Sequence, residues 1–197
     1  MAAVCVFCSS SVRIEPSYVE LAADVGAELA RRGHVLVSGG GSVSCMGAVA
    51  RAARAGGART IGVIPQVLLE LEVADHDADE LLVTPDMRAR KAAMDARSDA
   101  FLTLPGGLGT LEELLEIWVA RTLAMHGKPV VVLDPDGLYE PLRGQVDLLV
   151  ERGFVRPAAR DEVSWVHTVD AAFAAIERGR TPLARTVAPD EILEAEP

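Results

Sequence analysis

The sequence predicts an α/β fold: a Rossmann-like, doubly wound parallel sheet with helices on both faces, in a single domain. Short apolar runs alternate with longer segments of helical periodicity from about residue 4 to residue 178. Strands that alternate with helices of this length form parallel sheets, because each helix carries the chain back across a face of the sheet. Glycine-rich turns at 39–41 and 106–109 each follow an apolar run. Ligands of such sheets bind beyond the carboxyl ends of the strands, so both turns are expected to border one pocket.

The N-terminal half opens with a strand expected over 4–8. A helix over 16–32 follows, ends at Gly33 and carries apolar residues at helical spacing: Tyr18, Leu21, Ala22, Val25 and Leu29. The next expected elements are a strand over 35–38, a helix of small residues from about 46 to 55, a strand over 60–64 that ends at Pro65, and a short strand near 80–83.

The C-terminal half continues the alternation. The expected elements are a helix over 87–97, a strand over 100–104, a helix over 110–125, a strand over 130–133, a helix over 138–152, a strand over 163–166 and a helix over 170–178. We therefore place one α/β domain at 1–180. The remainder, 181–197, is acidic and has no apolar period, so a flexible tail is expected there.

Composition excludes several classes of function. Half of the 197 residues are apolar, but no run has the length of a membrane span. The formal charge of −10 opposes binding to nucleic acid or an anionic membrane, where a basic surface is expected. The three cysteines indicate reduced core thiols, and the N-terminus has no cleavable leader, so a cytoplasmic protein is expected. Cys5 and Cys8 have the spacing of half a zinc site, but no second pair of ligands exists. The stretch 75–79 resembles half of a calcium loop, but Glu80 stands where the loop needs glycine. Neither a metal nor a cofactor is therefore predicted.

The stretch 99–113 carries the strongest functional signal. A buried strand ends at Pro105, and Gly106, Gly107 and Gly109 allow positive φ and close approach of a ligand to the backbone. Thr110 has the residue type and spacing of an N-cap, with Glu113 completing a capping box. A helix start offers free N–H groups to an anion, and a phosphate is expected here. The alternative is a turn that binds nothing, with Glu113 as a capping partner.

In the two helices expected nearest this turn, helical spacing distinguishes candidate catalytic residues from residues that pack in the core. Leu111, Leu114, Leu115 and Trp118 form one apolar stripe, and Glu113 falls on the opposite side. Glu112 and Glu116 flank the stripe and remain alternatives. In the helix over 87–97, Arg90 shares a face with methionines, while Arg88, Lys91 and Arg97 compete with it.

A second apolar strip, Ile117, Ala120 and Ala124, lies nearly opposite the first. A helix that is apolar on two sides must be buried on both. The strip therefore predicts a homodimer, unless helix 87–97 or 138–152 of the same chain covers it.

Four segments together resemble the signature of the Lonely Guy (LOG) family, long mislabelled as lysine decarboxylases. They are Pro105-Gly-Gly-Leu-Gly-Thr-Leu-Glu-Glu113, Ser38-Gly-Gly-Gly41 with Met46-Gly47, Gly62-Val-Ile-Pro65, and Met87-Arg-Ala-Arg-Lys91. The resemblance implies cleavage of the N-glycosidic bond of a purine nucleoside 5′-monophosphate, cytokinin-type or adenosine, to free base and ribose 5-phosphate. It also implies a dimer. The alternative is a non-catalytic nucleotide- or molybdenum-cofactor-binding protein of the same fold.

The resemblance assigns roles residue by residue. Arg90 and Glu113 match the catalytic pair, and Lys91 and Glu72 match substrate-contacting positions. The remaining candidate binding residues border the three loops of the expected pocket: Ser9, Ser10, Gly40, Gly41, Met46, Gly106, Gly107, Gly109 and Thr110. For Ser9 and Ser10 turn capping is an equal explanation, and for Met46 helix packing is.

The sequence also departs from the family pattern. Ser9 and Ser44 stand where glycine is frequent, and Val119 where threonine is.

Overall fold

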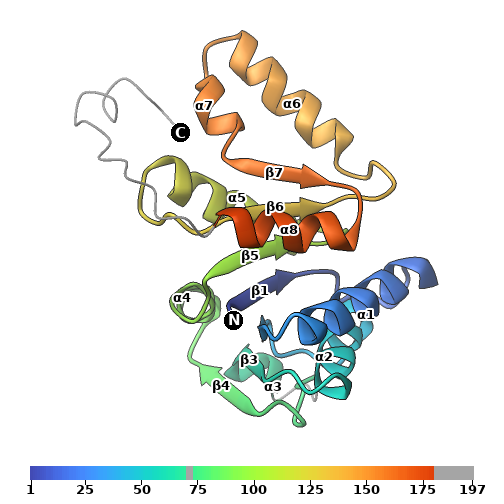
Figure 1. The fold of residues 1–197 in the computed structure, drawn as a ribbon. Coiled ribbons are helices and arrows are strands. Elements are labelled where there is room, and N and C mark those ends of the chain that lie inside the picture. Colours follow the sequence, from blue (N-terminus) through green and yellow to red (C-terminus); the bar gives the residue numbers. More distant parts are fainter. Residues whose placement is uncertain (70–72, 180–197) are drawn as a thin grey trace.

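A seven-stranded parallel sheet lies between two layers of helices in the computed structural model, which describes residues 1–69 and 73–179 (Figure 1). Each neighbouring pair of strands is parallel. The strands are β1 (Ala3–Phe7), β2 (Val35–Ser38), β3 (Thr60–Pro65), β4 (Glu80–Thr84), β5 (Ala100–Thr103), β6 (Val130–Leu133) and β7 (Val163–Val166). The predicted fold class is confirmed.

The strand order β4-β3-β2-β1-β5-β6-β7 places β1 between β2 and β5. From β1 the chain runs outward to β4 in one direction, and then returns past β1 to begin the other half of the sheet at β5. The loops that leave β1 and β5 consequently diverge to opposite faces. A crevice forms at such a switch point, outside the carboxyl ends of the strands.

The two faces of the sheet are covered by different helices, and alternate residues of β1 face each set. Val4 and Val6 point into the core under α1 (Pro16–Arg31), α2 (Ser44–Ala55) and α8 (Val169–Gly179). Cys5 and Phe7 point to the other side, under α4 (Met87–Ala96), α5 (Leu108–Thr122) and α6 (Glu140–Glu151). Side chains alternate between faces along a strand, and burial on both faces explains why these strands are almost wholly apolar.

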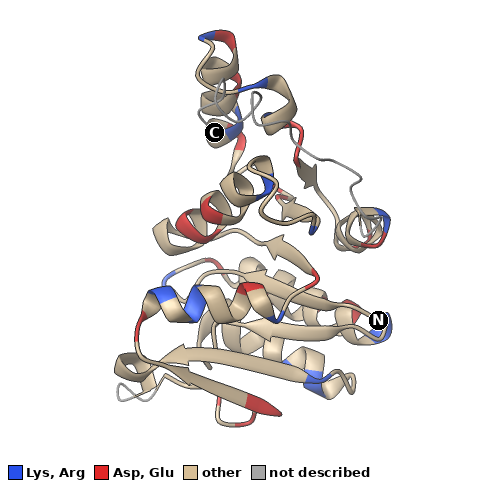
Figure 2. Ribbon diagram, turned by 90° about the vertical axis from the view of Figure 1, so that its left-hand side faces the viewer, with Lys and Arg blue, Asp and Glu red and all other residues tan. Residues whose placement is uncertain are grey.

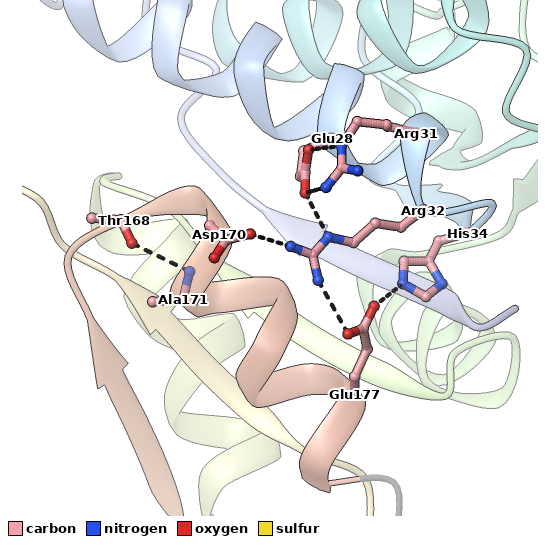
Figure 3. A network of polar contacts seen from close by, with 8 residues as sticks. All are labelled: Glu28, Arg31, Arg32, His34, Thr168, Asp170, Ala171 and Glu177. Carbon is pink, nitrogen blue, oxygen red and sulfur yellow. Dashed lines mark hydrogen bonds and ion pairs between the residues drawn. The ribbon is translucent and has the colours of Figure 1, made fainter.

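A polar network fastens α8 to the end of α1 (Figure 3). Arg32 pairs with Glu28, Asp170 and Glu177, and its guanidinium lies 5.5 Å from the centre of the Phe173 ring. The Nδ1 atom of the buried His34 accepts a hydrogen bond from the Ala2 N–H at 3.1 Å. The network joins the amino end of the sheet to α8, on the side away from the crevice.

The structure corrects several predicted boundaries. Helix α5 begins at Leu108 and ends at Thr122, and Ala124 then adopts φ 56°, which ends the helix earlier than its apolar pattern suggests. The short helices α3 (Gln66–Leu69) and α7 (Pro157–Arg160) were not predicted, because four residues are too few to show a helical period. The predicted tail, 181–197, lies outside the described residues. In the described ranges, no helix has both the length and the apolar character needed to cross a bilayer.

Candidate functional site

Three loops meet at the carboxyl edge of the sheet, where the strand order reverses. They follow β1 (residues 8–15), β2 (39–43) and β5 (104–107). The Leu104 N–H donates to the Phe7 carbonyl at 2.9 Å, which keeps the first and third loops side by side as they leave the sheet. The sequence-predicted turns therefore border one crevice, as expected.

Arg90 and Glu113 form an ion pair at this crevice. The Arg90 Nη1 atom lies 3.2 Å from Glu113 Oε1, and the two side chains are only 8% and 12% exposed. The guanidinium also donates from Nε to the Val63 carbonyl (3.0 Å) and from Nη2 to the Gly39 carbonyl (3.3 Å). Arg90 thus joins the ends of β2 and β3 to α5. Its fork geometry fixes where the Glu113 carboxylate points.

Burial raises the pKa of Glu113 above its ordinary value of 4.5, and the charge of Arg90 opposes that rise. Glu112, the adjacent carboxylate, raises the pKa further. A carboxyl group with a raised pKa can exchange a proton nearer to neutral pH than a surface glutamate can. Burial separates Glu113 from the two alternatives, because its side chain is 12% exposed whereas those of Glu112 and Glu116 are 56% and 51% exposed.

Lys91 lies on the outer side of the same helix pair. It contacts Glu112 and lies 2.6 Å from Glu116, and these hydrogen bonds raise its pKa. Figure 2 shows acidic positions coloured along the ribbon of α5 and basic positions along the ribbon of α4. The described contacts of Lys91 therefore join α4 to α5. A direct contact of Lys91 with substrate stays a prediction, and so does the role of Glu72, which lies outside the described residues.

The turn at 105–110 differs from its predicted geometry. Gly107, not Thr110, is the N-cap, and the first helical bond runs from Leu111 N–H to the Gly107 carbonyl at 3.0 Å. Thr110 and Glu113 do not form a capping box. Thr110 is instead buried against Gly106, where a Cβ atom would lie 2.2 Å from the Thr110 hydroxyl oxygen. None of the three glycines has positive φ.

The same turn nevertheless leaves its backbone accessible. A Cβ atom built on Gly107 or Gly109 would meet no heavy atom within 4 Å. Helical geometry leaves the N–H groups of residues 108–110 without acceptors in the helix. Open space beside free N–H groups at the positive end of a 15-residue helix is suited to an anion.

The turn at 39–41 is filled by the protein itself. A Cβ atom on Gly39 would lie 1.9 Å from Arg90 Nη2, and one on Gly41 would lie 2.7 Å from Met46 Cε. Gly40 has φ 72° and its carbonyl accepts from the Asp75 N–H at 2.8 Å. Met46 is thus placed over this turn, at the start of α2.

The loop after β1 is a run of serine turns. The buried Ser9 accepts through Oγ from the Ser11 N–H (3.0 Å), and Ser11 Oγ accepts from the Arg13 N–H (3.2 Å). Ser10 is exposed to solvent. Cys5 and Cys8 are free and buried, and burial raises the pKa of both thiols, which keeps them protonated and unreactive.

Ile117 of the predicted second apolar strip is covered within the chain, as the alternative to a dimer allowed, because it shares a core cluster with Met94 of α4 and Val146 of α6. Ile117 is 7% exposed, whereas Leu115, which was placed in the first apolar stripe, is 42% exposed. Ala124 lies beyond the end of α5. The exposed apolar residues of this region are Leu108, Leu115, Val119 and Met125. They border a groove of about 900 Å³ between α4 and α5.

Sequence reasoning missed the contribution of Gly39 and of the Val63 carbonyl to the site. Both hold Arg90, which comes from a helix far along the chain. The triple glycine predicted a turn, but nothing in its local pattern indicates that the first glycine makes room for a guanidinium. The segment 62–65 was predicted from its pattern as the end of a strand, and only the resemblance linked it to the site.

Comparison with known proteins identifies relatives along most of the chain. The family described as "Possible lysine decarboxylase" matches residues 46–176. A Mycobacterium marinum protein named "Cytokinin riboside 5′-monophosphate phosphoribohydrolase" is 49% identical over 89% of this chain and 94% of its own length. A protein of that name from Mycobacterium tuberculosis is 50% identical over 87% of this chain and 91% of its own length.

Solved structures share the fold. A molybdenum cofactor carrier protein from Chlamydomonas reinhardtii superposes with a TM-score of 0.68 at 21% identity, covering 91% of this chain and 98% of that one. Identity this low shows a common fold and no more. The relatives near 50% identity and the family match also establish the family to which the chain belongs. The chain belongs to the Lonely Guy family, the family predicted from its motifs and described as possible lysine decarboxylases.

Proposed function

We propose that this protein is a hydrolase that cleaves the N-glycosidic bond of a purine nucleoside 5′-monophosphate and releases free base and ribose 5-phosphate. The names of its relatives state this activity for cytokinin riboside 5′-monophosphates. The observation that carries the proposal is the nearly buried Arg90–Glu113 pair, placed one and a half turns from an accessible helix start. A protein that only bound nucleotides would need the turn but not the pair.

In the proposed reaction the bond between ribose C1′ and the base nitrogen breaks first. The electron pair leaves with the base, and C1′ acquires positive charge in a state that resembles an oxocarbenium ion. The Glu113 carboxylate stabilises this charge and accepts a proton from the water that forms the new bond to C1′. Glu113 then gives up this proton and the departing base nitrogen takes one up, so the hydroxyl of water ends on ribose C1′, its other hydrogen ends on the base, and the carboxylate is restored.

Arg90 has a positioning and electrostatic role in this scheme. An arginine keeps its proton at all ordinary pH values, so it is unsuited to be the general acid. Hydrogen bonds to two backbone carbonyls fix the position of its guanidinium, and the fixed guanidinium orients the Glu113 carboxylate. It also limits the rise in the pKa of Glu113 and so favours the ionised form that the reaction requires.

The phosphate is proposed to bind the first turn of α5, against Gly107, Gly109 and Thr110, with Gly106 allowing Thr110 to fold back. Binding energy gained at this phosphate can lower the barrier at the reacting bond. Ser9 and Ser10, on the neighbouring loop, are proposed to contact the phosphate or ribose. Gly40, Gly41 and Met46 form the proposed wall on the base side, and Lys91 a further contact.

The test is incubation with a panel of nucleoside 5′-monophosphates, with released base measured by chromatography. We expect a purine monophosphate to be hydrolysed and the matching nucleoside to react far more slowly. Equal hydrolysis of adenosine and AMP would contradict the phosphate site, and no release of base from any member would contradict the reaction.

We further propose that a second copy of the chain covers the groove between α4 and α5. Leu108, Leu115 and Val119 present an apolar surface there, bordered by the charges of Lys91 and Glu116. A surface of this kind is complementary to itself across a two-fold axis. Because Ile117 is in the core, Val119→Asp is the suitable variant. Light scattering should give twice 20.9 kDa for the wild type and a smaller mass for the variant. A monomeric wild type would refute the dimer.

A location in the cytoplasm is proposed as well. The three cysteines are free and buried. Unpaired cysteines are typical of proteins in reducing compartments.

A further inference from the structure

Ser44, the first residue of α2, has an unusual backbone conformation. Its φ is 50°, in the left-handed region that side chains other than glycine rarely adopt. Such conformations persist when surrounding contacts hold them in place, and they concentrate at functional sites. The structure shows one such contact: the Ser44 hydroxyl donates to the Ser11 carbonyl at 2.6 Å.

This hydrogen bond links two of the three loops of the crevice. Ser11 belongs to the serine turns after β1, in which each turn closes on the loop itself, through Ser9 and then through Ser11. Residues 10–13 are exposed, so packing contributes little to their position. The Ser44 hydroxyl reaches across from α2 and fixes the turn from outside.

The segment that carries Ser44 is itself fixed at its other end. The Gly39 carbonyl accepts from Arg90, and the Gly41 region pairs with Ala74. Residues 39–44 therefore run from the guanidinium that orients Glu113 to the hydroxyl that holds the serine loop. One short segment sets the relative positions of the catalytic pair and of the loop that carries Ser9 and Ser10.

We propose that Ser44 is a positioning residue for the ribose 5-phosphate part of the substrate. It acts by holding the loop of Ser9 and Ser10 against the crevice. The left-handed backbone aims the hydroxyl at Ser11, and the hydrogen bond offsets the cost of that backbone. This inference rests on the proposed function, because it assigns Ser44 to the binding of that substrate. Ser44 does not contact the reacting atoms, so its effect falls on KM and not on kcat.

Two substitutions separate the hydroxyl from the backbone conformation. Ser44→Ala removes the hydroxyl and keeps a side chain at φ 50°, whereas Ser44→Gly removes the hydroxyl and tolerates that φ. We expect the glycine variant to unfold at a higher temperature than the alanine variant. If the hydroxyl positions the loop, both variants should nevertheless raise KM for the hydrolysed monophosphate by the same factor, about three- to tenfold. The kcat of both should stay within about twofold of the wild type.

Ser98→Ala is the matched control. The Ser98 hydroxyl also donates to a backbone carbonyl, that of Met94, at 2.6 Å, but at the amino edge of the sheet. Its loss should lower the unfolding temperature and leave KM unchanged. If KM instead follows the unfolding temperature across the three variants, or if Ser44→Gly keeps the KM of the wild type, the positioning role is refuted.

Hydrogen exchange and binding make the test independent of turnover. The amides of Ser11 and Arg13 should exchange faster in both Ser44 variants than in the wild type. Both variants should also bind ribose 5-phosphate more weakly by calorimetry, by the same factor as the change in KM. A wild type that hydrolyses no monophosphate would refute the proposed function alone. Unchanged exchange at Ser11 together with unchanged ribose 5-phosphate binding would refute the role of Ser44 alone.

Discussion

The two glycine-rich turns of the crevice look alike in sequence and differ in what occupies the space their glycines leave. At 39–41 the space is taken by the protein: the Arg90 guanidinium lies against Gly39 and the Met46 side chain against Gly41. At 106–109 only Gly106 is filled in this way, by Thr110, while Gly107 and Gly109 face open space.

The difference separates two uses of a missing side chain. In the first turn glycine allows the Arg90 side chain to pass close to the backbone and bond to it. In the second turn glycine leaves open space in which we propose that the phosphate binds. A run of glycines therefore does not itself indicate a ligand, and the contacts of an imagined Cβ atom distinguish the two cases.

The largest effect is expected at Glu113, which lies in the helix after the second turn and is joined to the first turn through Arg90. Glu113→Gln keeps the shape of the side chain and an oxygen that can accept from Arg90, but removes the charge that stabilises the ribosyl cation. Loss of one such group typically lowers the rate by about 10²–10³. The measurement is kcat for a purine monophosphate, with AMP binding by calorimetry as the control. A kcat near that of the wild type would contradict the proposed role of Glu113 in stabilising the ribosyl cation.

The filled turn can be broken at Gly39. In Gly39→Ala the new methyl group would lie 1.9 Å from Arg90 Nη2, so the guanidinium must leave the Gly39 carbonyl. Overpacking of this kind costs about 1–3 kcal/mol of stability, and we expect kcat to fall at least about tenfold as Glu113 loses its orientation. Denaturant unfolding and steady-state kinetics check the two effects. An unaffected kcat would show that Arg90 does not need this contact.

The contrast between the turns illustrates that local spacing in the sequence predicts helices and strands, whereas it does not predict tertiary contacts. Periodicity located all seven strands and the long helices, because each buries a face whose spacing is local. It misplaced the start of α5 by two residues, because Thr110 is a residue type that often forms an N-cap, whereas in the structure its side chain packs against Gly106. It also placed Leu115 in a buried stripe and Ile117 in a separate strip nearly opposite, because a helix in contact with a second helix does not follow one ideal stripe.

The candidate site was predictable in part for the same reason. The turn of 105–109 and the carboxylate four residues after it are local in sequence. The Arg90 guanidinium reaches Gly39 across 51 positions of the chain, and only the folded topology brings them together.

Because Glu113 is buried, we expect raising the pH to have opposite effects on activity and on stability. As the pH rises, kcat should increase and the contribution of Glu113 to stability should decrease. Its pKa is raised on folding, so its stabilising contribution is complete below the unfolded value near 4.5 and is lost as the pH rises through the folded pKa. Its proposed role needs the ionised form, so kcat should fall as the pH drops through a value above 4.5. The unfolding temperature of Glu113→Gln, relative to the wild type, should increase from pH 4.5 to pH 8. A pH-independent difference would contradict the raised pKa.

The smallest effect, and the most direct comparison with Gly39, is expected at Gly109. This residue lies within the first turn of α5, has no positive φ, and has open space where a Cβ atom would be. Alanine is favoured over glycine inside a helix by about 0.5–1 kcal/mol, so Gly109→Ala should make the protein more stable. The new methyl group would occupy space that we assign to the phosphate, so KM should rise several-fold while kcat changes little. Unfolding by denaturant and kinetics on one purine monophosphate measure both. Equal loss of stability at Gly39 and Gly109 would remove the distinction between the turns, and an unchanged KM in Gly109→Ala would place the phosphate elsewhere.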